Sequence, residues 1–321
     1  MKTPCRGRNA LTDRIATTRG ESIGRQVGPV RDAIGFLAHI PELFNHYREI
    51  WKHLDGSNVE IVNAGEGADG DVIARLAQRE GLVARPLSAC LGGPRLRYMV
   101  SNHPVDPSGD PLIKRLAHTN VRLMYGLGKA GWNLQAWNAL YDAILCFGPH
   151  QAESLAGVTD AALIQVGYPR FDPFFHGMAD RHTLLSRFGA HDSRPTVVWL
   201  PTWKSLSSVP LHAHAVAGLQ ERFNVIVKLH PLAHDDGTRS ADILAEAGIS
   251  TVITDATDNL PLYRIADYLL CDYGGPAFGG GVAEGEVALW QAPCRQRTSA
   301  RRSLRRPPNP LTTLRPARPA G

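Results

Sequence analysis

The sequence predicts an α/β fold built from two consecutive parallel-sheet units that face each other across a ligand cleft. Three observations lead to this prediction. From Ala33 onward, short apolar runs alternate with amphipathic stretches, which is the pattern of a parallel sheet flanked by helices. Two prolines and four aromatic residues interrupt the alternation at residues 167–177. It then restarts, and two such units place a cleft beside the carboxyl ends of their strands.

In the first unit the apolar runs predict strands, and the stretches between them predict helices. The strands are expected at residues 33–38, 59–63, 96–100, 121–125, 143–147 and 163–166. A helix is expected at residues 41–54, because proline stands near its start, apolar residues recur at helical spacing and Asp55-Gly56 ends it. Asp69 is expected to cap a second helix that ends at Gly81.

The second unit repeats this rhythm after the interruption. Strands are expected at residues 196–200, 225–228, 251–254 and 268–271, and helices at residues 212–223, 240–247 and 260–265. We place the domain boundary between residues 170 and 171, with the first domain at residues 33–170 and the second at residues 171–292. The periodic pattern stops soon after Gly281.

Composition excludes several classes of protein. The 321 residues are 43% hydrophobic and 20% charged, which is typical of a globular protein and not of a disordered or fibrous one. No apolar run approaches the roughly 18 residues that span a bilayer, and residues 1–31 hold no signal-peptide block, so a cytoplasmic location is expected. The five cysteines are scattered without CxxC spacing and predict free thiols and no metal site.

Basic charge is concentrated at the two ends of the chain. Residues 294–321 carry eight arginines and no acid, and residues 1–32 carry seven basic and three acidic groups, while the whole chain is only +5. The body between them is therefore acidic. We expect a flexible basic segment at residues 1–32 and a disordered Arg/Pro-rich tail at residues 293–321. Because the basic charge lies at the ends, no specific nucleic-acid partner is expected.

The strongest chemical signal is Lys228-Leu229-His230-Pro231, where a predicted strand runs into a loop. Proline ends the strand and leaves His230 at the rim of the cleft, where Lys228 and His230 can neutralise a phosphate. Alternatively, Lys228 extends along the strand end beside a hydrogen-bonded histidine. His234 follows four residues later, but the proline disfavours a shared helical face and hence a metal pair.

A glycine-rich turn follows the last predicted strand. In Asp272-Tyr273-Gly274-Gly275, glycines let the backbone approach a ligand, and the N–H groups of the next helix favour an anion. The turn is thus a candidate diphosphate cradle. Asp272 either caps the turn or binds a substrate hydroxyl, and the glycines could instead serve tight packing alone.

A second glycine-rich segment starts at Tyr125 and reads YGLGKAGWN. It contains GxGxxG after a strand, but near the end of the first domain rather than in its opening unit, so it is a weak dinucleotide signal. It also lacks the GK[ST] ending of a phosphate-binding P-loop. We interpret it as a loop facing the acceptor, with Lys129 supplying positive charge.

Two further stretches are predicted to flank the cleft. Arg170 pairs either with a phosphate or with Asp172. Ser207 and Ser208 either donate hydrogen bonds to a ligand or cap the following helix.

Taken in order, segments between residues 121 and 280 resemble the CDP-glycerol glycerophosphotransferase family of teichoic acid polymer synthesis. The segments are MYGLGKAGWN, YDAILCFGPHQAE, VGYPRFDPFF, VVWLPTWKSLSS, NVIVKLHP and ADYLLCDYGGPAFGG. The resemblance implies a GT-B fold with two Rossmann-like domains and a nucleotide-diphosphate donor held mainly by the second domain. It also implies transfer of glycerol phosphate or a related alditol phosphate to a hydroxyl acceptor.

The resemblance also implies roles for individual residues. His230 would help to neutralise the donor diphosphate, the turn at residues 272–275 would contact its phosphates, and Lys129 would lie on the acceptor side. The candidate catalytic residues are therefore His230, Lys129 and Tyr125. The candidate substrate-binding residues are Arg170, Lys228, Ser207, Ser208, Asp272, Tyr273, Gly274 and Gly275.

The chain departs from the family pattern in three places. Family members typically have a histidine, a natural general base, where this chain has Tyr125. Many members have two serines where this chain has Gly274-Gly275. After about Gly281 the chain turns into its Arg/Pro-rich tail, so we expect the second domain to be incomplete at its end, either truncated or read out of frame. These departures favour a divergent branch with another donor or acceptor, or reduced catalytic power.

The expected function is transfer of an alditol phosphate from a CDP-activated donor to a hydroxyl acceptor in cell-surface polymer synthesis. A glycosyltransferase using a nucleotide sugar and a non-catalytic nucleotide-binding homologue are the alternatives. No metal or other cofactor is expected. Because family acceptors are commonly lipid-linked, peripheral contact with the anionic inner face of the cell membrane is also expected.

Overall fold

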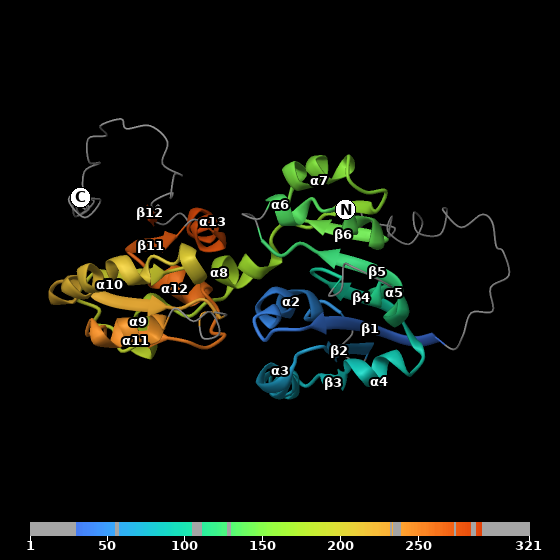
Figure 1. Cartoon of the computed structure of the whole chain (residues 1–321), viewed down its shortest axis with the longest axis horizontal. Coiled ribbons are helices and arrows are strands. Elements are labelled where there is room, and N and C mark those ends of the chain that lie inside the picture. The colour runs from blue at the N-terminus through green and yellow to red at the C-terminus, as the bar shows by residue number, and fades with distance from the viewer. Residues whose placement is uncertain are drawn as a thin grey trace, which may run out of the picture.

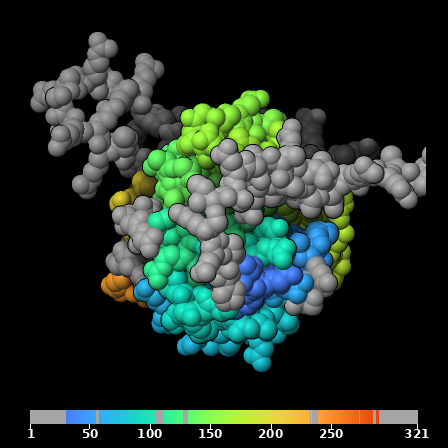
Figure 2. Space-filling model, turned by 90° about the vertical axis from the view of Figure 1, so that its right-hand side faces the viewer, coloured from blue at the N-terminus to red at the C-terminus, as the bar shows by residue number. Residues whose placement is uncertain are grey.

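The chain folds into two α/β domains joined by a short helical connection. The computed structural model describes residues 30–54, 58–104, 111–126, 130–231, 233, 239–272, 274–283 and 287–290. Figure 1 shows the first domain in blue to green and the second in yellow to red, with α8 between them. Figure 2 looks onto the end of the molecule formed by the first domain.

The first domain is built on a seven-stranded sheet with the order β3-β2-β1-β4-β5-β6-β7. All its neighbouring strands are parallel. The chain builds the sheet outward from β1 in one direction and then from β4 in the other, so β1 and β4 flank the point where the strand order reverses. The strands are β1 (Val30–Ala38), β2 (Val59–Asn63), β3 (Val83–Pro86), β4 (Arg95–Ser101), β5 (Ala117–Leu123), β6 (Ala143–Cys146) and β7 (Ala162–Gln165).

The second domain repeats this topology on a five-stranded sheet with the order β10-β9-β8-β11-β12. Its neighbouring strands are again parallel, and the order reverses between β8 and β11. The strands are β8 (Thr196–Leu200), β9 (Asn224–Lys228), β10 (Thr251–Ile253), β11 (Tyr268–Asp272) and β12 (Val287–Trp290). In such sheets, ligands bind beside the carboxyl ends of the strands where the order reverses.

Helices connect the parallel strands, as crossover connections require. In the first domain they are α2 (Leu43–Trp51), α3 (Gly67–Arg79), α4 (Leu87–Leu91), α5 (Leu112–Leu116), α6 (Ala130–Asn133), the 3₁₀ helix η2 (Ala136–Leu140) and α7 (Pro149–Ala156). The connection to the second domain holds η3 (Pro169–Phe171), α8 (Asp172–His176) and α9 (Arg181–Arg187). The second domain holds η4 (Lys204–Leu206), α10 (Val209–Ala217), η5 (Gly218–Glu221), α11 (Ser240–Glu246), α12 (Leu260–Ile265) and α13 (Gly275–Val282).

Both faces of each sheet are buried, which explains why the strands read as continuous apolar runs rather than as alternating ones. On β1, Leu37 packs into one core cluster while Phe36 belongs to the cluster on the opposite face. On β8, Trp199 and Val198 divide between two clusters in the same way. Burial on both faces therefore produces the continuous apolar runs from which these strands were predicted.

The predicted parallel-sheet architecture is confirmed, and several elements have the predicted limits. Residues 59–63, 196–200 and 260–265 form β2, β8 and α12 as expected. The strand expected at residues 121–125 instead spans Ala117–Leu123, which leaves Tyr125 in the loop that follows. The prediction missed β3, because this edge strand is short and largely exposed and so lacks an apolar run.

After Gly281 the α/β pattern continues for one more strand. Strand β12 pairs in parallel with β11 and adds a further strand to the second sheet. At the other end, β1 begins at Val30, so residues 30–32 belong to the first sheet and not to the expected flexible segment. Residues 1–29 and the expected tail at residues 293–321 lie outside the described residues.

The predicted domain boundary falls in the connection between the two sheets, after β7 and before β8. The prolines that interrupt the periodicity stand in the short helices η3 and α8. Aromatic contacts run across this connection. The ring centroids of Tyr168 and Phe171 are 5.0 Å apart, and those of Phe171 and Tyr263, which belongs to the second domain, are 6.0 Å apart.

Candidate functional site

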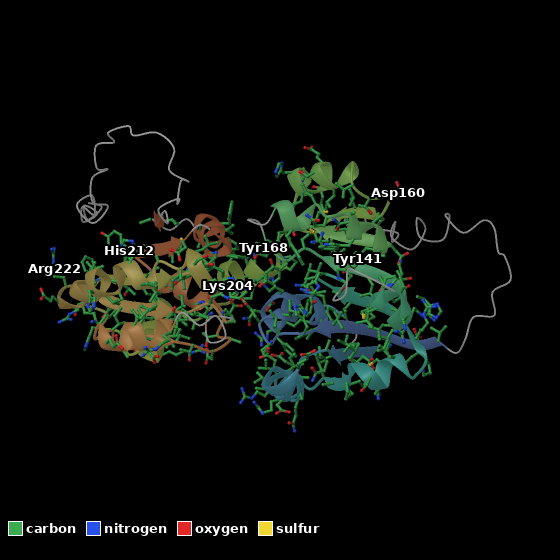
Figure 3. All side chains as sticks on the ribbon, viewed as in Figure 1. Tyr141, Asp160, Tyr168, Lys204, His212 and Arg222 are labelled. Atoms are coloured by element: carbon green, nitrogen blue, oxygen red, sulfur yellow. The ribbon has the colours of Figure 1, made fainter. Side chains whose placement is uncertain are left out.

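A cleft of about 250 Å³ lies at the junction of the two domains. Its walls are the segments that follow β5 in the first domain and β8, β9 and β11 in the second, together with the start of α2 and the connection at residues 168–171. The carboxyl edges of both sheets therefore border one cavity. The labelled side chains of Tyr168 and Lys204 lie in this region, between the two domains (Figure 3).

Lys228 is the last residue of β9 and lines the cleft while remaining only 4% exposed. Within the part of the chain that the structure describes, its ammonium group makes no hydrogen bond or ion pair. Burial lowers the pKa of Lys228, and Glu42, at the start of α2 in the first domain, acts in the opposite direction. A buried cation of this kind gains most from an anion that enters the cleft.

His230 lies two residues further, at the mouth of the cleft. Its ring stacks almost parallel on Trp203, with centroids 5.4 Å apart and an angle of 8° between the planes. The Nζ atom of Lys204 lies 4.1 Å from the centre of the Trp203 ring. The turn after β8 therefore supplies a ring on which His230 stacks, and Lys204 places a cation over the same tryptophan ring.

Asp272 lines the cleft but is already engaged by the backbone. One of its carboxylate oxygens accepts hydrogen bonds from the N–H groups of Thr202 and Ser208, at 2.7 and 3.1 Å. Asp272 thereby ties the end of β11 to the turn after β8. This geometry corresponds to the turn-capping alternative of the sequence analysis.

Gly274 and Gly275 also line the cleft, and α13 begins at Gly275. Pro276 has no N–H group, and the Ala277 N–H donates to the Gly274 carbonyl at 3.2 Å. The Gly275 N–H is the donor that remains in the first three residues of the helix, where the helix dipole places partial positive charge. Pro276, the second residue of the helix, also lines the cleft. The turn therefore places the start of α13 at the cavity that Lys228 and His230 line.

Ser207 and Ser208 do not belong to the lining of the cleft. They are 7% and 6% exposed, and their hydroxyl groups are engaged in the protein. The Ser208 hydroxyl accepts a hydrogen bond from the Trp199 indole, and the Ser207 hydroxyl accepts one from the Val209 N–H. Both serines lie beneath the site, where they hold the start of α10.

Arg170 lines the cleft and links three parts of the molecule. It donates to Asp258 in the second domain at 2.9 Å, and its other terminal nitrogen lies 2.9 Å from Nε2 of His46 on α2. Because arginine only donates, His46 accepts this bond. The expected alternative partner of Arg170, Asp172, is not the residue that it pairs with.

Tyr125 lines the first-domain wall of the cleft. Its ring lies 4.6 Å from the ring of His46 and is tilted by 33°. Burial raises the pKa of the Tyr125 phenol well above its usual range, and the neighbouring Glu42 adds to this shift. The phenol is therefore protonated at neutral pH and is a poor general base.

Three residues of the sequence-based set lie outside the described residues: Lys129, Tyr273 and His234. The structure adds two residues that the sequence did not single out, Glu42 and His46, which both line the cleft. They stand four residues apart on one face of a helix, but nothing in the local sequence indicates that this face meets the second domain.

Among the described residues there is no group of three or more His, Cys, Asp or Glu side chains that could hold a metal ion. No helix in the described part of the chain is both long and apolar enough to cross a membrane.

Comparison with known proteins connects this geometry to a family. Residues 151–279 match the family model described as CDP-Glycerol:Poly(glycerophosphate) glycerophosphotransferase. No curated protein sequence matches the chain.

Several solved structures share the fold. The wall teichoic acid polymerase TagF is 14% identical, with a TM-score of 0.53 over 79% of this chain and 69% of that chain. A TagF variant soaked with CDPG is 13% identical, with a TM-score of 0.52 over 80% and 69% of the two chains. The S. aureus MnaA–UDP co-structure is 10% identical, with a TM-score of 0.53 over 82% and 80%.

At these identities the structural matches establish the fold alone. The family match concerns the sequence of residues 151–279, which contain β8, β9 and β11. The family match supports the resemblance seen in the motifs of this segment. The chain therefore has the GT-B architecture, and over residues 151–279 it carries the sequence pattern of the CDP-glycerol:poly(glycerophosphate) glycerophosphotransferase family.

Proposed function

We propose that this chain is a transferase that moves glycerol phosphate, or a related alditol phosphate, from a CDP-activated donor to a hydroxyl acceptor in the synthesis of a teichoic-acid-like polymer. The observation that carries the proposal is the convergence of Arg170, Lys228, His230 and the N-terminus of α13 on one cavity. This cavity lies where the strand order of the second sheet reverses. A diphosphate is the ligand that such a set of donors fits best.

The negative charge of its diphosphate indicates on which side of the cleft the donor binds. Lys228 and the α13 backbone lie at the carboxyl edge of the second sheet, so the diphosphate of the donor belongs on this side of the cleft. His230, stacked on Trp203, adds a further donor at the mouth. The alditol end of the donor then points towards the first domain, where Glu42, Tyr125 and Gly126 form the opposite wall.

The reaction is a direct displacement at phosphorus. The acceptor oxygen forms a bond to the phosphorus that carries the alditol, and the bond from this phosphorus to the bridging oxygen breaks. CMP leaves with the bonding electron pair, and the acceptor hydroxyl gives up its proton to a base. Arg170, Lys228 and His230 stabilise the negative charge that develops on the leaving nucleotide. In this scheme the nucleotide donor is a substrate, and no cofactor is invoked.

Glu42 is the base that the geometry supports. It lies on the first-domain wall, and within the described part of the chain its carboxylate has no hydrogen bond or ion pair. It is close enough to influence Lys228, Arg170 and Tyr125. Tyr125 is protonated and the accepting nitrogen of His46 is bound by Arg170, so neither is available to take the proton.

A nucleotide-sugar glycosyltransferase is the second candidate, because the MnaA–UDP co-structure is an example of this fold with UDP in place of a cytidine nucleotide. A non-catalytic nucleotide-binding homologue is the third, because Tyr125 cannot act as a base. We place the acceptor, including a lipid-linked one at an anionic membrane surface, on the side of the first domain.

Calorimetric titration with CDP-glycerol, CDP-ribitol, CDP and UDP tests the proposal, on the native chain and on His230→Ala. Binding of a cytidine ligand that His230→Ala weakens about tenfold or more is expected, since a hydrogen bond to a charged group contributes about 1.5–3 kcal/mol. His150→Ala, which alters an exposed histidine on α7, is the control. Preference for UDP would favour the glycosyltransferase, and failure of a folded chain to bind any nucleotide would overturn the proposal.

A further inference from the structure

Most of the aromatic side chains that line the cleft pack against another ring. Phe278 on α13 also lines the cleft, but within the described residues its ring contacts neither another ring nor a cation. The cleft-lining residues that have a ring partner include Tyr125, Tyr168, Phe171, Trp203 and Tyr263. Phe278 therefore presents a ring to the cavity that the protein itself does not cover with a second one.

Phe278 is 38% exposed although it lies in a concave site. A single exposed phenylalanine on the outer surface of a protein is ordinary. At the wall of a cavity that Arg170, Lys228 and His230 also line, the same exposure places an apolar ring beside polar groups that face a ligand. A ligand ring that covers it would remove this apolar surface from water. The ring is therefore a candidate contact for a flat, apolar part of the ligand.

Phe278 lies about one helical turn from the place proposed for the diphosphate. The Gly275 N–H is the backbone donor at the start of α13, and Gly275 and Phe278 are both exposed and both line the cleft. Residues three apart lie on the same face of a helix, with about 5–6 Å between their Cβ positions. The ribose of a nucleotide spans a separation of this order between the phosphate and the base. A nucleotide with a phosphate at Gly275 can therefore place its base on Phe278.

On the helix face that carries Phe278, the neighbouring positions have no side chain. Gly275 precedes Phe278 by three residues and Gly281 follows it by three, and nothing lies within 4 Å of a Cβ atom placed at either glycine. Gly279 and Gly280 instead face the packed side of α13, where an added Cβ atom would lie 2.5 Å from a neighbouring side chain. The ring of Phe278 therefore stands between two open positions, where a planar ligand can reach it.

The proposed donor has one group that fits an exposed phenylalanine ring. A CDP-alditol consists of an alditol, a diphosphate, a ribose and a pyrimidine base, and of these groups the base is the flat, aromatic one. An aromatic side chain can stack on any base, because every base has a π-face. Such a contact adds affinity for nucleotides without choosing between cytosine and uracil.

We propose that Phe278 is the platform on which the nucleobase of the donor stacks, one helical turn beyond the Gly275 N–H that meets the diphosphate. The donor then extends from α13 towards Lys228 at the end of β9, along the carboxyl edge of the second sheet. This assignment rests on the proposed function for the presence of a nucleotide, and it adds the residue that holds the base.

Calorimetric titration of the native chain and of three variants with CDP and with UDP tests the platform without requiring catalysis. Phe278→Ala should weaken both nucleotides at least about fivefold, because it removes the stacking surface. Phe278→Trp, which keeps a π-face, should bind both within about twofold of the native chain. Phe278→Leu keeps an apolar side chain but has no π-face, so its affinities should resemble those of Phe278→Ala rather than those of Phe278→Trp.

Proton NMR of bound CDP observes the base directly. A phenylalanine ring that stacks on cytosine shifts the H5 and H6 resonances of the base to higher field. We expect this shift with the native chain and its loss with Phe278→Leu at equal saturation. Phe175→Ala is the matched control, because it removes a phenylalanine that is 56% exposed but does not line the cleft, and it should change neither the affinity nor the shift.

The outcomes distinguish this inference from the proposed function. CDP binding whose affinity and cytosine shifts are the same in the native chain, Phe278→Ala and Phe278→Leu overturns the platform and leaves the proposed function standing. Binding of UDP in preference to CDP, weakened by Phe278→Ala, supports the platform and overturns the cytidine donor. A folded native chain that binds neither nucleotide overturns both. If Phe278→Ala does not fold, the affinities and shifts of Phe278→Leu decide the question.

Discussion

At the scale of single residues, the site depends on two opposite charges that face each other across the cleft. Glu42 stands on the first-domain wall and Lys228 on the second-domain wall, and neither has a hydrogen bond or ion pair within the described residues. Side chains that remain unpaired in this way are available to a substrate. The two residues therefore give the sharpest tests of the proposed chemistry.

Glu42→Gln should lower the transfer rate about a hundredfold or more, because general-base catalysis typically contributes 10²–10⁴-fold. The affinity for CDP should stay within about twofold, since Glu42 is placed on the acceptor side. The rate of CMP release in the presence of acceptor measures the first quantity and calorimetry the second. Tyr125→Phe is the matched control and should retain most of the rate, because its phenol is protonated in the native chain. Equal rates for Glu42→Gln and the native chain would remove Glu42 from the mechanism.

Lys228→Met should weaken CDP binding about tenfold or more and also change the pH dependence of stability. Because burial lowers the pKa of Lys228 in the folded state, the unfolded chain binds the proton more tightly, and stability rises with pH between the two pKa values. The cost of the buried ammonium is fully present below the lowered pKa. The variant should therefore be more stable than the native chain at neutral pH, with an advantage that shrinks towards pH about 10.4.

Urea unfolding at several pH values measures this advantage. A variant whose stability differs from that of the native chain by the same amount at every pH would contradict the assignment of a buried ammonium to this position.

At the scale of elements, α13 can pack closely against α12 and β11 only because it is rich in glycine. A Cβ atom at Gly279 would lie 2.5 Å from the Tyr263 hydroxyl, and one at Gly280 would lie 2.5 Å from a Leu269 methyl. At Gly281 nothing lies within 4 Å of the corresponding position. Gly279 and Gly280 are therefore needed for close packing, whereas a side chain at Gly281 would meet no neighbour.

Gly279→Ala should destabilise the fold by about 1–3 kcal/mol, because it forces Tyr263 and the start of α13 to move. Gly281→Ala is the matched control and should stabilise the helix by up to about 1 kcal/mol, since alanine restricts the unfolded chain more than glycine does. Chemical denaturation measures both, and CDP titration should show a loss of affinity for Gly279→Ala alone. The packing argument fails if the two substitutions have effects of the same sign.

At the scale of the whole molecule, a few polar contacts set the position of one domain against the other. Arg170 in the connection joins His46 of the first domain to Asp258 of the second. Close by, the Asn45 side chain of α2 donates to the carbonyl of Ala256 at 3.0 Å. Since both contacts involve α2, the same helix that carries Glu42 also fixes its distance from Lys228.

Asp258→Asn should weaken this link between the domains. Asparagine keeps the oxygen that accepts the Leu260 N–H, but it leaves the mostly buried Arg170 without a carboxylate. We expect a loss of about 1–3 kcal/mol in stability and a larger loss in transfer than in CDP binding, because transfer needs both walls in register. Asp192→Asn, in the exposed pair with His182, is the control and should cost less than about 1 kcal/mol. Unchanged transfer in Asp258→Asn would exclude this role.

The sequence alone determined the architecture and the second-domain half of the site. Strands buried on both faces leave continuous apolar runs, so β2 and β8 could be delimited from the residues themselves. Lys228 and His230 could be found because the end of a strand and a proline mark the rim of a parallel sheet. These signals are local, and local chemistry is what a sequence displays directly.

Only the tertiary structure decided which first-domain residues face the second-domain half of the site. Glu42 on α2 meets Lys228, because parallel strands bring the loops at their carboxyl ends together from distant parts of the chain. Ser207 and Ser208 were selected by their place in a motif, yet packing turned both into supports beneath the cleft. The orientation of a side chain depends on the neighbours that packing supplies, and the chain gives no local signal for those neighbours.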